Sequence, residues 1–242
     1  MKSKSDKVKA FILHSRSYQE SSMILQVFSF ELGLFSVIAK GIKGKKSQAK
    51  KAILQPFQIL AIEFAGKSNL KTLVSCELES DQSINTFSFQ DKKLACAFYS
   101  NEILMRALPE RHEYPELFKS YYQLLVNLAK TSDYSLALRQ FEIALLSAIG
   151  LAPDFTYDVN GEEISADKNY LLIPERGFTQ ASEFEQASSY SGQSVIALST
   201  GIISEACLVD CKNICRQLMR NVIGDKPLQS RKLWQHISLS NS

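Results

Sequence analysis

The spacing of hydrophobic residues along the chain changes after about residue 81. Before it, short runs rich in β-branched and aromatic residues alternate with glycines, a pattern typical of strands joined by turns. The runs predict five strands, at Lys7–Tyr18, Ser22–Phe30, Leu34–Ile42, Phe57–Phe64 and Leu70–Leu78. Five short strands favour a closed barrel, because closure removes exposed strand edges. We expect an OB-fold, and strand count alone leaves an SH3-like barrel open as the alternative.

From about Phe89 onward, apolar residues recur every three or four positions, as on one face of a helix. They predict helices that end at Leu108 and that span Pro115–Leu128, Ser135–Ile149, Ser204–Ile223 and Leu228–Ile237. Glycines and prolines interrupt residues 151–200, which we expect to be irregular. The predicted fold class is α+β. An OB-fold DNA-binding domain at 1–81 precedes a helical domain at 82–242, with the irregular insert at about 151–200.

Positive charge is concentrated in the first third of the chain. Residues 1–81 hold 13 Lys and Arg against 7 Asp and Glu, whereas the remaining 161 residues hold 15 against 18. Charge separated in this way indicates a polyanionic partner for the first third.

A lysine run between the third and fourth predicted strands is the sharpest feature. Six lysines lie within residues 40–51, and no acidic residue occurs between Gly33 and Ile62. These lysines are Lys40, Lys43, Lys45, Lys46, Lys50 and Lys51. A flexible cationic loop on a barrel would bind nucleic-acid phosphates and release their counterions. The alternative is a solvated loop that binds nothing.

OB-folds combine a basic groove with aromatic platforms on which bases stack. Most aromatic residues in a small barrel belong to its core, so Phe11, Phe28 and Phe35 are weak candidates. Tyr18 is the better one, because it ends a strand in a polar segment. Arg16 is a candidate phosphate contact, and an exposed structural arginine is the alternative interpretation.

The cysteines and the apolar runs indicate a cytoplasmic protein. Five cysteines without a C-x-x-C pair do not resemble a secreted disulfide framework. No stretch approaches the roughly 18 apolar residues of a membrane span, and no signal core follows the N-terminus. Cys207, Cys211 and Cys215 form one helical stripe bordered by apolar residues, which favours core packing over a metal site.

Signatures of enzymes are missing from the sequence. It contains no P-loop, no dinucleotide-binding glycine motif, no nucleophile elbow and no H-E-x-x-H pair. Asp158, Glu162, Glu163 and Asp167 suggest a metal nuclease site less readily than an acidic surface loop. We therefore predict a protein without catalytic residues, metal or cofactor.

Several segments, taken in order, resemble the RecO family of DNA repair proteins. They are Phe11–Ser22, Val37–Gly41, Leu54–Phe57, Leu70–Leu73, Asn101–Leu104, Pro115–Phe118, Leu138–Leu146 and Lys226–Arg231. The resemblance implies a non-catalytic recombination mediator that binds single- and double-stranded DNA and anneals complementary strands. It also implies that RecR is a partner in loading RecA onto DNA coated by single-strand-binding protein.

The resemblance further implies a groove for the acidic, Phe-terminated tail of single-strand-binding protein. Such a groove needs an apolar slot and a cation for the carboxylate, which suits arginine. Arg139 matches the family's Leu-Arg position and is the candidate cation, with Leu138, Phe141 and Leu145 as the apolar face. The competing interpretation is that Arg139 only pairs with Glu142.

Two departures from many relatives affect these expectations. Residues 152–176 lack the cysteines of a four-cysteine zinc site, so the chain resembles the zinc-free branch. Gln140 replaces a basic residue found after the arginine in some relatives. A scaffold that keeps the barrel but reads no DNA is the alternative function, and a metal nuclease is a more distant third.

Overall fold

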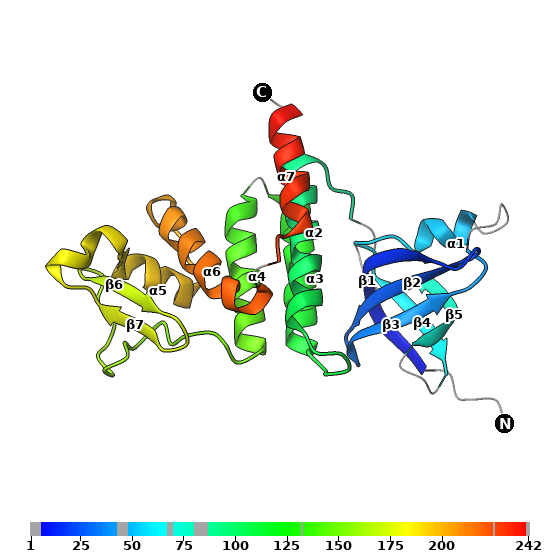
Figure 1. The fold of residues 1–242 in the computed structure, drawn as a ribbon, viewed down its shortest axis with the longest axis horizontal. Helices are drawn as coiled ribbons and strands as arrows, with labels where there is room; N and C mark the ends of the chain where they lie inside the picture. Colours follow the sequence, from blue (N-terminus) through cyan, green and yellow to red (C-terminus); the bar gives the residue numbers. More distant parts are fainter. Residues whose placement is uncertain are drawn as a thin grey trace. The chain divides into compact units, whose positions relative to one another are not determined.

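The computed structural model describes residues 6–42, 48–66, 70–79, 87–131, 133–224 and 226–240. The chain divides into two compact units, one formed by Met1–Thr131 with Pro227–Ser242 and the other by Ser132–Lys226. Figure 1 shows a barrel with helices in the first unit, and helices with a small sheet in the second.

The N-terminal part of the first unit is a closed five-stranded barrel, an OB-fold, as the sequence predicts. Its strands are β1 (Asp6–Tyr18), β2 (Ser22–Ser29), β3 (Gly33–Ala39), β4 (Leu60–Ala65) and β5 (Lys71–Leu78). The order around the barrel is β1-β2-β3-β5-β4, with β3 and β5 parallel and the other pairs antiparallel. Helix α1 (Gln48–Ile53) lies between β3 and β4, where a flexible loop was expected.

Strands β1 and β2 carry apolar residues on both faces because both faces are covered. Residues such as Ile12, Leu25 and Val27 fill the barrel interior. On the outer face, the rings of Phe11 and Phe28 lie 5.3 and 5.6 Å from that of Phe118 in helix α3 (Pro115–Lys130). The helix therefore buries the outer face of β1 and β2.

Helices α2 (Asp91–Ala107), α3 and α7 (Gln229–Ser240) complete the first unit. The buried amide of Asn101 in α2 donates to the carbonyl of Leu13 in β1 (2.8 Å) and accepts from the Tyr121 hydroxyl. Glu102 accepts from the backbone N–H groups of Gln229 and Ser230, each at 2.9 Å, and so caps the start of α7. The C-terminal helix is thereby fixed to α2.

The second unit contains helix α4 (Tyr134–Ala148), a three-stranded sheet, α5 (Gly192–Thr200) and α6 (Leu208–Ile223). The sheet has the order β7-β6-β8, from β6 (Asn169–Ile173), β7 (Gly177–Gln180) and β8 (Tyr190–Ser191). Two short 3-10 helices, η2 (Glu183–Ser188) and η3 (Glu205–Cys207), follow β7 and α5. Residues 151–200, expected to be irregular, thus contain a sheet and a helix.

Glycine allows these short elements to meet closely. A Cβ at position 192 would lie 1.9 Å from the carbonyl oxygen of Ser165, so only glycine fits where β8 passes into α5.

Cys207, Cys211 and Cys215 are fully buried in the core of the second unit, which confirms the prediction of core packing. Burial raises the pKa of Cys211 to about 12, so its thiol stays protonated and unreactive.

Across the described residues, no single helix is long and apolar enough to cross a membrane. Helix α5 and the segment Glu205–Ile223 reach the length and the apolar composition of a membrane span only when they are taken together, and the chain bends by 108° between them. Apolar residues from both parts, among them Val195, Leu198 and Ile214, belong to the buried core of the second unit.

Candidate functional site

Strand register gathers three of the candidate DNA contacts at one end of the barrel. Tyr18 pairs with Ser22, and Arg16 pairs with Ile24, which in turn pairs with Ile38 in β3. Lys40 follows Ala39, the last residue of β3. Arg16, Tyr18 and Lys40 therefore lie at the same end of three neighbouring strands, a grouping that we call the barrel-end cluster.

The side chains of this cluster face solvent. Arg16 and Lys40 are exposed, and Tyr18 keeps 37% of its surface accessible. The backbone N–H of Ile42 donates to the carbonyl of Ser21 at 2.8 Å, which ties the segment after β3 to the β1–β2 turn. Glu20 lies in that turn, two residues after Tyr18, and carries an exposed negative charge.

The remaining candidate lysines follow in the connection to β4. Lys50 and Lys51 occupy helix α1, where Lys51 is exposed and Lys50 is half-buried. Burial raises the pKa of the Cys76 thiol in β5, and the nearby ammonium group of Lys50 makes this rise smaller. Lys43, Lys45 and Lys46 lie outside the described residues.

The phenylalanines on the barrel strands are not available to nucleic-acid bases. Phe11, Phe28 and Phe35 are buried, as expected for core residues. The outer face of β1 and β2 around Phe11 and Phe28 is covered by α3. Tyr18 is thus the stacking candidate that the structure leaves accessible.

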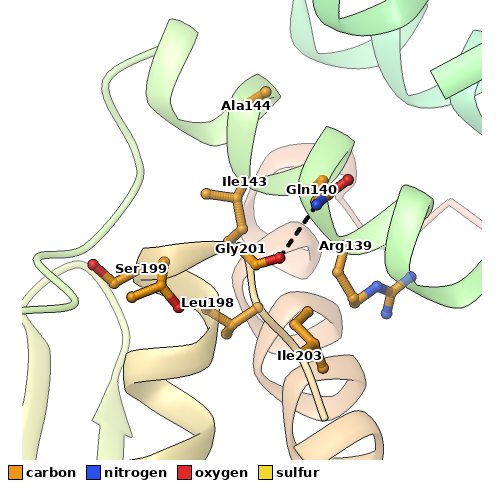
Figure 2. A pocket seen from close by; sticks show the side chains of 9 residues that line it. Arg139, Gln140, Ile143, Ala144, Leu198, Ser199, Gly201 and Ile203 are labelled. Atoms are coloured by element: carbon orange, nitrogen blue, oxygen red, sulfur yellow. Dashed lines mark hydrogen bonds between the residues drawn. The ribbon is translucent and has the colours of Figure 1, made fainter. Parts of the chain in front are cut away.

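A pocket of ≈ 260 Å³ lies between α4 and the C-terminal end of α5 in the second unit. Figure 2 shows side chains of α4 facing α5 and the segment after it, with a hydrogen bond from the Gln140 amide to the Gly201 carbonyl (3.2 Å). The pocket is lined by Arg139, Gln140, Ile143, Ala144, Leu198, Ser199, Thr200, Gly201 and Ile203. We call it the α4–α5 pocket.

Only one of the four residues expected to hold a partner tail lines this pocket. Leu138, Phe141 and Leu145 are buried and point into the packed side of α4, so they do not form an apolar slot at the surface. Arg139 does line the pocket. The sequence alone did not reveal the apolar lining by Ile143, Leu198 and Ile203, because the last two lie 55 and 60 residues after Ile143 in the chain.

Arg139 forms a two-point ion pair with Glu142, as the competing interpretation predicts. Its Nε lies 2.9 Å from Oε2 of Glu142, and its Nη2 donates to Oε1 at 3.0 Å. The Arg139 side chain is 11% exposed and that of Glu142 only 2%. Arg139 Nη1 donates to the carbonyl oxygen of Lys212 at 3.5 Å, so the backbone of Lys212 in α6 lies beside Arg139, and Lys212 itself is exposed.

The acidic residues after α4 shape a loop. The carboxylate of Asp158 accepts from the backbone N–H groups of Asn160 (2.8 Å) and Glu162 (3.0 Å). These hydrogen bonds, led by that from Glu162, lower the pKa of Asp158. Among the residues that the structure describes, no three His, Cys, Asp or Glu side chains come together as metal ligands.

Comparison with known families gives two matches along the chain. Residues 1–81 match the model described as "Recombination protein O N terminal", and residues 90–232 match "Recombination protein O C terminal". Together they cover both the barrel and the helical region.

The chain belongs to the RecO family.

Curated relatives align with this RecO chain over nearly their whole length. The DNA repair protein RecO of Pseudoalteromonas atlantica is 34% identical over 231 residues, which cover 95% of this chain and 94% of the relative. The RecO proteins of Alteromonas mediterranea and Idiomarina loihiensis are each 38% identical, over 93% and 94% of this chain and 95% and 97% of the relatives. This RecO chain is a DNA repair protein of that family.

Proposed function

We propose that this RecO chain is a non-catalytic, cytoplasmic mediator of recombinational repair that binds single- and double-stranded DNA through the barrel-end cluster and α1. The observation that carries the proposal is the strand register, which places Arg16, Tyr18 and Lys40 at one end of the barrel. The sequence, which lacks nucleotide-binding and hydrolase motifs, supports a mediator without catalysis.

The chemistry of the cluster fits a nucleic-acid backbone. Arg16, Lys40 and Lys51 are exposed cations that contact phosphates and release counterions without regard to sequence. The accessible ring of Tyr18 offers a base one stacking surface, which is sequence-tolerant. A site of this kind suits annealing, because it holds the phosphates and leaves the pairing edges of the bases free.

Fluorescence anisotropy with a labelled single strand tests this site. The triple variant Arg16→Gln, Lys40→Gln, Lys51→Gln should bind about ten-fold or more weakly at moderate salt. A matched variant, Lys92→Gln, Lys119→Gln, Lys130→Gln, removes the same charge from helices α2 and α3 and should bind like the parent. Equal weakening of both variants would mean that net charge alone drives binding.

The alternative function, a scaffold that reads no DNA, makes the opposite prediction. Under that interpretation the parent itself shows no salt-sensitive DNA binding, and the anisotropy of the labelled strand is the same with either variant as with the parent. The proposed partnership with RecR and the loading of RecA rest on family membership. They are tested by asking whether the triple variant, mixed with RecR, still supports RecA loading on DNA coated by single-strand-binding protein.

We propose in addition that the α4–α5 pocket holds the tail of single-strand-binding protein. Its apolar lining by Ile143, Leu198 and Ile203 suits a Phe side chain, and Arg139 and Gln140 supply polar groups beside it. Glu142 offsets much of the charge of Arg139, so Arg139 alone attracts an acidic tail only weakly. The exposed Lys212 near Arg139 is the second cation in this proposal.

Position 140 allows the pocket to be tested without disturbing the buried ion pair. Gln140 is exposed and lines the pocket. Gln140→Lys should tighten binding of a tail peptide about five-fold, and Gln140→Glu should weaken it by a similar factor, because an exposed ion pair is worth up to about 1 kcal/mol. The same changes at Ser147, exposed on α4 but outside the pocket, should have little effect. Equal affinity for all four variants would place the tail elsewhere.

A further inference from the structure

Helix α6, orange in Figure 1, carries a line of positive side chains on the face that it turns to solvent. Lys212, Arg216 and Arg220 follow one another at intervals of four residues, and all three are exposed. Residues four apart lie one turn from each other on the same side of a helix, so the three cations form one ridge about 12 Å long. We call it the α6 ridge.

The opposite side of α6 holds the ridge in place. Cys211 and Ile214 are fully buried in the core of the second unit. Gln217 adds two hydrogen bonds, since its amide nitrogen donates to the Leu172 carbonyl (3.1 Å) and its amide oxygen accepts from the Tyr190 hydroxyl (3.0 Å). The backbone that carries the cations is thus already ordered, which lowers the entropic cost of binding a ligand there.

The positive charge of the ridge is not neutralised by ion pairs. Among the residues that the structure describes, no carboxylate forms a salt bridge with Lys212, Arg216 or Arg220. Asp210 is the one acidic residue of α6, and its Oδ2 accepts from the hydroxyls of Ser191 (3.2 Å) and Ser194 (3.1 Å). Its carboxylate is therefore bound on the side of α6 that faces β8 and α5.

The sequence around the ridge has the same bias. No lysine or arginine occurs between Arg176 and Lys212, whereas residues 212–232 hold six basic residues and one acidic residue. The net negative charge of the last 161 residues therefore conceals a short basic segment. Cations concentrated in this way indicate a polyanionic partner for the second unit as well.

The composition of the ridge fits a nucleic-acid backbone. Two of its three cations are arginines, whose planar guanidinium groups bind phosphate oxygens with two hydrogen bonds. Asn213 and Asn221 are exposed on the same helix and add neutral donors of the kind that contact phosphates and sugars. At roughly 3.4 Å per nucleotide of a B-form strand, the ridge spans about three to four phosphates.

An acidic peptide is the competing ligand, because the Lys212 backbone lies beside Arg139 of the α4–α5 pocket. Peptide recognition needs slots for side chains, whereas a phosphate backbone needs only donors and positive charge. Val209 is the one large apolar residue of α6 that is exposed among those the structure describes. The ridge beyond the pocket therefore favours DNA.

We propose that the α6 ridge binds the sugar–phosphate backbone of a second DNA strand while the barrel-end cluster binds the first. The proposal rests on the proposed function, because it takes the barrel-end cluster as the other DNA site. The two sites belong to different units of the chain, so one RecO molecule holds two strands at once. Contacts to phosphates leave the bases of both strands free to pair, as annealing requires.

Capture of two strands by one protein tests the ridge. A short biotinylated strand is fixed sparsely on beads, RecO is bound to it, and a fluorescent strand that cannot pair with the first is added. The parent should retain the fluorescent strand. Arg216→Gln combined with Arg220→Gln should still bind the first strand but retain about ten-fold less of the second, because two phosphate contacts are lost. Lys212 stays unchanged in this variant, since it lies beside the α4–α5 pocket.

Lys168→Gln combined with Arg176→Gln is the matched control. Both residues are exposed in the same unit, so the control loses the same charge and should retain the second strand like the parent. Circular dichroism verifies that both variants are folded. The proposal is overturned if the parent retains no second strand or if the ridge variant retains as much as the control. It is also overturned if the ridge variant loses only the binding of an acidic tail peptide, because the ridge is then a peptide site.

Failure of the proposed function gives a different result. The variant Arg16→Gln, Lys40→Gln, Lys51→Gln then captures both strands like the parent, whereas the ridge variant still loses the second strand. That outcome supports the ridge and removes the barrel-end cluster as its companion site.

Discussion

Replacing Arg139 by alanine should destabilise the second unit strongly. The guanidinium and the Glu142 carboxylate meet at 2.9 and 3.0 Å, and the carboxylate side chain is only 2% exposed. Exposed pairs at this spacing on a helix contribute only a few tenths of a kcal/mol. Removal of one partner from a buried pair instead leaves an uncompensated charge, at a cost of about 3–5 kcal/mol. That loss is a large part of the roughly 5–15 kcal/mol that stabilises a typical domain.

A second variant separates the ion pair from simple loss of packing. Arg139→Leu combined with Glu142→Leu removes both charges and keeps apolar volume, so it should recover most of the lost stability. Urea unfolding followed by circular dichroism gives the midpoint and slope for each protein. The reasoning is refuted if Arg139→Ala unfolds within about 0.5 kcal/mol of the parent, as surface substitutions do. The result also bears on tail binding, because an Arg139→Ala protein that is partly unfolded loses the α4–α5 pocket for reasons unrelated to charge.

Two further predictions concern the C-terminal helix and metal. Burial raises the pKa of Glu102, but the hydrogen bonds from Ser230 and Gln229 outweigh it, so the net pKa lies below the ordinary 4.5. This carboxylate therefore stabilises α7 docking above pH 4.5 and loses its contribution as the pH falls through the lowered pKa. Fluorescence of Trp234, the only tryptophan of the chain and located in α7, should report undocking in that range. Glu102→Gln should abolish this pH dependence, and a transition that survives in the variant would assign it to another group. For metal, elemental analysis should find no stoichiometric zinc and a chelator should leave the melting temperature unchanged, whereas one tightly held zinc per chain would contradict the prediction.

The barrel was predictable because its strands obey local rules. Runs of β-branched residues separated by glycines give strands and turns, and the predicted bounds lie within a few residues of β1, β2, β3 and β5. The fourth strand begins at Leu60 rather than Phe57, since Phe57 adopts a positive φ of 67° that extended strands do not allow.

Elements that depend on tertiary contacts were harder to predict. Helix α1 has six residues in a lysine-rich segment, too short for a helical period to show. The sheet at residues 169–191 has strands of two to five residues whose glycines and prolines look like an irregular loop.

The candidate sites, too, combine residues that the local sequence identifies with an arrangement that only tertiary contacts produce. Arg16, Tyr18 and Lys40 were identified one by one, and strand register then brought them together. In α4 the stripe of Leu138, Phe141 and Leu145 is the most apolar, and for that reason it is buried in the core. The pocket uses the neighbouring stripe, which the sequence does not distinguish from an ordinary half-buried face.

The salt dependence of DNA binding tests the central claim most directly. In a plot of log affinity against log salt concentration for a single strand, the slope measures the phosphates neutralised. Neutralising Lys43, Lys45, Lys46 and Lys50, or separately Arg16, Lys40 and Lys51, should flatten this slope by roughly 0.7 for each phosphate that the variant no longer neutralises. Glu20→Gln, which removes the negative charge next to the cluster, should tighten binding. An unchanged slope in both sets of variants would contradict the claim that this end of the barrel binds the DNA backbone.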